Sequence, residues 1–93
     1  MIVRIMGEGQ FEIDDSRLQD LNALDDALTA AVEAGDDARF RPALAALLDA
    51  VRQAGTPVAD DALVDSDLVL PYTDAHIDDV RAMLSGEGGL IPG

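Results

Sequence analysis

The sequence contains no cysteine, no lysine and no tryptophan, and its only aromatic side chains are Phe11, Phe40 and Tyr72. Without cysteine the chain can form no disulfide framework, thiolate zinc site or cysteine nucleophile. The shortage of aromatic side chains argues against the deep, aromatic-walled cleft of a glycoside hydrolase. The core must therefore consist of Leu, Val, Ile and Ala, a composition typical of packed helices.

Cationic side chains are also scarce. Nineteen acidic residues face six arginines, which gives a net charge of −13 at pH 7. Such a surface repels nucleic-acid phosphates and anionic lipid headgroups, so we expect no nucleic-acid partner and no direct membrane binding. Fifteen of the acids are Asp, an excess typical of a high-GC or halophilic genome in which surface acid aids solubility. The charge by itself therefore identifies no site.

The length of 93 residues and a hydrophobic content of 48% predict one folded domain over residues 1–93. A domain of this size buries roughly 60–65% of the surface of its unfolded chain. The longest apolar stretches are only a few residues, so we expect neither a signal peptide nor a transmembrane segment. The expected location is the cytoplasm.

The N-terminal pattern is that of a β-hairpin. Two short apolar runs, Met1–Met6 and Gln10–Ile13, flank the turn sequence Gly7-Glu8-Gly9. The turn lacks the third glycine of a dinucleotide-binding loop, and no helix follows it directly. We therefore expect a hairpin and no cofactor.

Two helices are predicted next. Ser16 and Gln19 fit a capping box, and Gly35 is placed to end the first helix in a left-handed conformation. Its apolar positions recur at three- and four-residue spacing: Leu18, Leu21, Leu24, Leu28, Ala31 and Val32. The acidic residues of this helix are expected on its other, polar faces: Asp20, Asp25, Asp26 and Glu33. Asp36 or Asp37 can cap the second helix, which Gly55-Thr56-Pro57 ends. Its apolar stripe is Phe40, Leu44, Leu47, Leu48 and Val51, and Pro42 is acceptable only near its start. The short connection forces an antiparallel helical hairpin.

The last third of the chain predicts a loop from Pro57 to Asp67, a short buried strand at Leu68-Val69-Leu70, and a helix capped by Thr73 or Asp74. The expected fold class is therefore α+β, with an N-terminal β-hairpin, an antiparallel helical hairpin, a short third strand and a C-terminal helix.

Acidic doublets are the most conspicuous pattern. Three of them, Asp14-Asp15, Asp36-Asp37 and Asp78-Asp79, lie at or near predicted helix starts. There carboxylates accept hydrogen bonds from free backbone N–H groups and meet the positive end of the helix dipole. The doublets are thus interpreted as structural features.

The loop acids Asp60, Asp61, Asp65 and Asp67 could in principle chelate a divalent cation. The loop lacks the central glycine and terminal glutamate of an EF-hand. We therefore expect a solvated loop and no metal site, with a small acidic divalent-metal-binding domain as an alternative. His76 is the single histidine, expected to be exposed, and no nucleophile motif accompanies it, so we predict that the chain is not an enzyme.

Some apolar and aromatic residues outside the predicted helices are candidates for partner binding: Phe11, Tyr72, Leu90, Ile91 and Pro92. Tyr72 follows Pro71, and the apolar tail of the sequence supplies Leu90, Ile91 and Pro92. Residues of this kind either fold back over the sheet or remain available to anchor a partner. The sequence leaves both interpretations open.

The whole chain resembles the small PspA-associated family, named for phage shock protein A. The most specific blocks are the first eleven residues, MIVRIMGEGQF, and the last five, GLIPG. Further matching blocks are Leu24-Asp25-Asp26-Ala27-Leu28, Val32-Glu33-Ala34-Gly35-Asp36, Gly55-Thr56-Pro57 with Asp60-Asp61, Ser66-Asp67-Leu68-Val69-Leu70-Pro71, Asp74-Ala75 and Asp79-Val80-Arg81.

The resemblance implies a non-catalytic adaptor or regulatory protein of a phage-shock-type membrane stress response. Its partner would be a PspA-like coiled-coil protein that coats the inner face of the membrane. With a charge of −13, the chain would be peripheral at that membrane through its partner and not through lipid. Two further alternatives remain: an acidic inhibitor of a basic protein, and a homo-oligomer formed through the edge of the hairpin.

Overall fold

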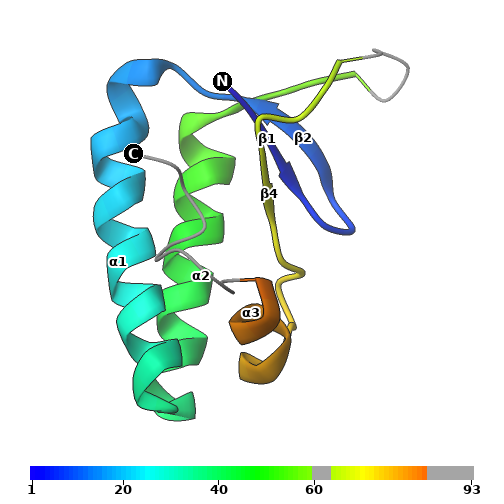
Figure 1. Cartoon of the computed structure of the whole chain (residues 1–93). Helices are drawn as coiled ribbons and strands as arrows, with labels where there is room; N and C mark the ends of the chain where they lie inside the picture. The colour runs from blue at the N-terminus through cyan, green and yellow to red at the C-terminus, as the bar shows by residue number, and fades with distance from the viewer. Residues whose placement is uncertain (60–63, 84–93) are drawn as a thin grey trace.

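The computed structural model describes residues 1–59 and 64–83 and consists of a small sheet packed on a pair of helices (Figure 1). The elements in chain order are β1 (Ile2–Ile5), β2 (Gly9–Glu12), a 3₁₀ turn (Asp15–Arg17), α1 (Leu18–Ala34), α2 (Asp37–Ala54), β3 (Thr56–Pro57), β4 (Leu68–Leu70) and α3 (Ile77–Met83). The predicted α+β class is confirmed.

The sheet has the strand order β3-β2-β1-β4. The predicted hairpin is confirmed, with β1 antiparallel to β2 and Val3 opposite Phe11. Strand β4 has the predicted bounds and runs parallel to β1. The two-residue strand β3 was not predicted, because Pro57 lacks the backbone N–H that a strand normally donates. In the structure β3 lies at the edge of the sheet, where proline is tolerated.

The helical hairpin forms as predicted, with α1 and α2 antiparallel beside each other and α3 at the foot of β4 (Figure 1). Gly35 ends α1 with φ +66°, and the Asp36 carboxylate accepts a hydrogen bond from the backbone N–H of Arg39 at the start of α2. All five predicted apolar side chains of α2 are buried. They pack with Val3 and Ile5 of β1 in one core.

Several predicted helix ends differ from the structure. Asp14, and not Ser16, provides the first cap, since its carboxylate accepts from the Ser16 N–H at 3.0 Å and lies before the 3₁₀ turn. The hydrogen bond from the Ser16 backbone N–H holds the pKa of Asp14 below its usual value. The third helix begins at Ile77, later than a cap at Thr73 or Asp74 requires. A turn at residues 73–74 separates it from β4.

Two residues of the helical hairpin occupy unexpected positions. Asp25, expected on a polar face, is only 2% exposed and is the one buried charged residue of the described chain. It follows Leu21 by four residues, so helical geometry places it on the core side of α1. Pro42 lies in the second turn of α2. The Ala38 carbonyl, which would otherwise accept from residue 42, belongs to an exposed residue.

Within residues 1–59 and 64–83, no helix combines the length and the hydrophobicity that a membrane span requires.

Candidate partner-binding surface

Strand β4 separates its side chains between the core and the outer face of the sheet. Leu68 and Leu70 are buried against the helices, whereas Val69 between them is exposed. This alternation follows from the pleat of a strand, in which successive side chains point to opposite faces. Arg4 of β1 is the Cα partner of Val69, so both side chains belong to the outer face.

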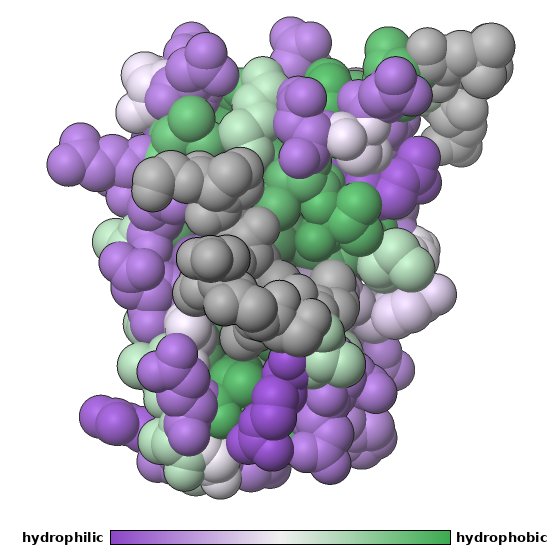
Figure 2. Space-filling view, viewed as in Figure 1, coloured by the Kyte–Doolittle hydropathy of each residue, from purple (hydrophilic) through white to green (hydrophobic). Residues whose placement is uncertain are grey.

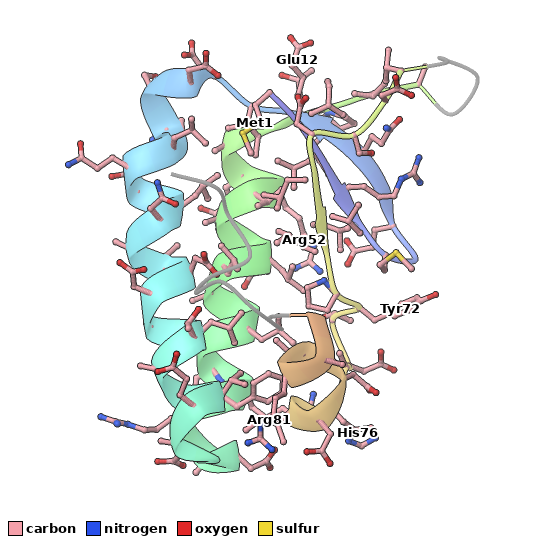
Figure 3. All side chains as sticks on the ribbon, viewed as in Figure 1. Met1, Glu12, Arg52, Tyr72, His76 and Arg81 are labelled. Atoms are coloured by element: carbon pink, nitrogen blue, oxygen red, sulfur yellow. The ribbon has the colours of Figure 1, made fainter. Side chains whose placement is uncertain are left out.

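The ring of Tyr72 lies against the turn between β1 and β2. A Cβ atom built on Gly7 would lie 2.8 Å from Tyr72 Cε1 and 2.9 Å from Cδ1, so only glycine leaves room for the ring. Gly7 also has φ +84°, a conformation that other residues rarely adopt. The side chain of Tyr72 projects away from the body of the protein and is 50% exposed (Figure 3).

Exposed apolar residues gather in a shallow depression of about 790 Å³ between β4 and α3, which we call the β4–α3 depression. Its apolar lining is Met6, Val69, Pro71, Tyr72, Ala75 and Ala82, and its polar lining is Asp74, His76, Asp78 and Asp79. Three of the four large hydrophobic residues exposed in the described chain lie here; the fourth is Val64. Figure 2 shows hydrophobic surface where β4 lies, with hydrophilic side chains above it and to its right.

Helix α3 presents the acidic border of this depression. The Asp79 carboxylate accepts a hydrogen bond from the backbone N–H of His76 at 3.2 Å, and Asp78 lies 3.5 Å from Arg81. Arg81 also donates to the carbonyl of Val32 at 3.0 Å. A cation at this position satisfies a carbonyl at the C-terminal end of α1 and meets the negative end of its dipole. Arg81 thereby holds α3, and its carboxylates, against the helical hairpin.

A second set of charges fixes the hairpin turn on the helices. Arg52 of α2 donates from Nε and Nη2 to both carboxylate oxygens of Glu8, with the Nε–Oε1 distance at 2.8 Å. Its third nitrogen donates to Asp49 at 2.6 Å. The hydrogen bond from Arg52 holds the pKa of Glu8 below its usual value. The turn that seats Tyr72 is thus tied to α2.

The predicted partner-binding residues do not all lie together. Tyr72 is in the β4–α3 depression, but Phe11 is half-buried and packs against the core, where it pairs with Val3 and Pro57. Leu90, Ile91 and Pro92 lie outside the described residues. Sequence reasoning missed Met6 and Val69. Val69 carried a local signal, because an apolar residue between two buried leucines of a strand must face the other side of the sheet.

The acidic loop of the sequence has a structural role at its C-terminal end. The Asp67 carboxylate accepts a hydrogen bond from the Ile2 N–H at 2.8 Å, and the Gln10 amide donates to Ser66 at 2.8 Å. These contacts hold the end of the loop on the sheet. Asp60 and Asp61 lie outside the described residues. Across residues 1–59 and 64–83, no group of three His, Asp or Glu side chains is arranged to hold a metal ion.

The sequence model of the family described as PspA-Associated protein (PspAA) matches residues 1–93. No curated protein and no solved structure matches the chain. The family match covers every element that builds the β4–α3 depression, from the hairpin to α3. The chain therefore belongs to the PspA-associated protein family.

Proposed function

We propose that the chain is a non-catalytic adaptor of a phage-shock-type membrane stress response that binds a PspA-like coiled-coil partner through the β4–α3 depression. The description of its family names an association with PspA. The observation that carries the proposal is the convergence of Met6, Val69 and Tyr72 in one place. Exposed apolar side chains gathered within a polar border are typical of protein interaction sites.

The chemistry of the depression suits binding more than catalysis. It is shallow and open, and its single histidine is exposed beside carboxylates. A catalytic site needs groups that act on one reacting atom in a space from which water is excluded. Tyrosine, by contrast, contributes a large rigid contact area at low entropic cost, and it is enriched among residues that dominate binding energy.

The net charge restricts how such an adaptor reaches a membrane. Lipid leaflets that carry anionic headgroups repel a chain of charge −13. The partner would therefore hold the adaptor at the inner face of the membrane, and the free adaptor would remain in the cytoplasm. Flotation with anionic liposomes should recover the chain only when PspA is present.

The direct test is the affinity of the purified chain for the PspA of the same organism, measured by isothermal titration calorimetry. Tyr72→Ala should weaken binding by about 30-fold, the loss typical of a residue that dominates an interface. Val64→Ala is the matched control, because Val64 is 42% exposed but does not line the β4–α3 depression. Val64→Ala should bind as the wild type does. Absence of wild-type binding, or equal binding by Tyr72→Ala, would contradict the proposal.

A further inference from the structure

Charges of opposite sign border the β4–α3 depression on two sides. Arg4 is exposed and lies beside Val69 on the outer face of the sheet, where the two are Cα partners in the β1–β4 pairing. On the other side, Asp74, Asp78 and Asp79 line the depression. The apolar floor therefore lies between a cation on the sheet and carboxylates on and before α3.

Arg4 stands apart from the other arginines. Four of them form ion pairs within the described chain, and a fifth, Arg41, lies over the ring of Phe40. Arg4 makes no such contact with any residue of the described ranges. In a chain with nineteen acids, an arginine has many carboxylates available. Exposed beside an apolar surface, and without an ion pair to residues 1–59 or 64–83, Arg4 is therefore a group available to a carboxylate of a partner.

We infer that the β4–α3 depression takes a helical segment whose apolar stripe is bordered by basic residues toward α3 and by an acidic residue toward Arg4. This inference rests on the proposed function and names the chemistry of the partner segment. Helices of coiled coils carry such a pattern, with charged side chains flanking an apolar seam. Opposite charges on the two borders fix the orientation of the docked helix, since the reversed helix brings like charges together.

A second copy of this chain fits the depression less well. A two-fold contact would place the same surface patch on both sides of the interface, and even with the borders crossed the three carboxylates on and before α3 would meet only one cation, Arg4, of the second copy. Each chain also carries a net charge of −13. A partner segment with basic residues toward α3 removes this repulsion.

The test uses charge reversals in the full chain, with PspA of the same organism as the probe and affinity as the readout. Arg4→Glu and Asp74→Arg should each weaken binding about tenfold, because each places like charges across the interface. Arg17→Glu and Asp26→Arg are the controls. They make the same changes in net charge on exposed residues of the 3₁₀ turn and α1, outside the depression, and should leave the affinity within twofold.

Arg4→Glu separates the inference from general attraction between an acidic chain and a basic partner. If an acidic chain merely attracted a basic partner, Arg4→Glu would bind more tightly because the chain gains negative charge. The charge arrangement inferred for the depression predicts weaker binding, because the new carboxylate would face the acidic residue of the partner. Equal or tighter binding by a folded Arg4→Glu variant would overturn the inference. If Tyr72→Ala still weakened PspA binding, the proposed function would stand without it. If the wild-type chain failed to bind PspA, the proposed function and this inference would both be wrong. Both would also be wrong if light scattering showed a dimer that Tyr72→Ala converts to a monomer.

Discussion

Gly7 and Tyr72 depend on each other at the residue scale. The left-handed conformation of Gly7 forms the turn, and the missing side chain leaves room for the tyrosine ring. For Tyr72 as the proposed anchor, the backbone of the turn is the rigid support that a binding residue on a loop needs. Half of the Tyr72 side chain remains exposed when its ring lies against the turn.

Gly7→Ala should lower the free energy of unfolding by about 2 kcal/mol. About 1 kcal/mol comes from the positive φ and the remainder from displacement of the Tyr72 ring. Gly9→Ala is the control, because Gly9 has φ +123° but no atom within 4 Å of the position of a Cβ. Gly9→Ala should lower the free energy of unfolding only by the contribution of the positive φ, about 1 kcal/mol. Urea unfolding of both variants measures the difference, and equal costs would show that Tyr72 does not rest on Gly7.

Asp25 shows where residue-scale sequence reasoning stops. The spacing of Leu21, Leu28 and Val32 defines the buried side of α1, and Asp25 lies on the same side. Its charge nevertheless suggested a polar face, because ionised side chains are rarely buried without a partner. Helical spacing was the better guide to its position than residue type.

At the scale of secondary-structure elements, the ion pair between Glu8 and Arg52 connects the β1–β2 turn to α2. The Glu8 pKa is lower in the folded chain than its ordinary value of 4.5, so the pair contributes stability above that pH. The contribution is lost as the pH falls through the folded pKa. Both side chains are partly exposed, so the contribution should stay below about 1 kcal/mol.

Glu8→Gln should therefore reduce the free energy of unfolding at pH 7, and this deficit should shrink as the pH falls below 4.5. Urea unfolding between pH 3 and 7 measures it, with Glu12→Gln as the control. Glu12 is exposed on β2 and forms no ion pair within the described residues. A deficit that stays constant with pH, or that the control reproduces, would refute the assigned role of the Glu8 carboxylate.

Periodicity predicted the long elements well, because α1 and α2 carry their apolar side chains at helical spacing and end at Gly35 and Gly55. The short elements were harder. Strand β3 has two residues and no alternation to detect. The sequence predicted β4 itself but not its parallel pairing with β1, because that pairing joins distant segments and leaves no local pattern.

The β4–α3 depression is a property of the whole molecule. Met6 follows β1, Val69 belongs to the edge strand, and Tyr72 precedes α3. The parallel β1–β4 pairing and the contact of the Tyr72 ring with Gly7 bring these three residues together. The sequence indicated Tyr72 as a candidate anchor, but the surface around it required the tertiary structure.

Net charge also acts at the scale of the molecule. Acidic residues cap helices at Asp14, Asp36 and Asp79, so part of the charge supports the fold. The remaining surface charge opposes contact with anionic lipid and with nucleic acid. The proposed adaptor would therefore depend on a protein partner, and the proposal assigns its specificity to an apolar surface with charges at its border.

Hydrogen exchange of the chain with and without PspA of the same organism tests the central claim most directly, because it locates the contact without a mutation. PspA should slow amide exchange across residues 68–82, which form β4, the connecting segment and the body of α3. Exchange along α1 should not change. Protection confined to α1 and α2, with unchanged exchange in residues 68–82, would contradict the assignment of the β4–α3 depression as the partner-binding surface.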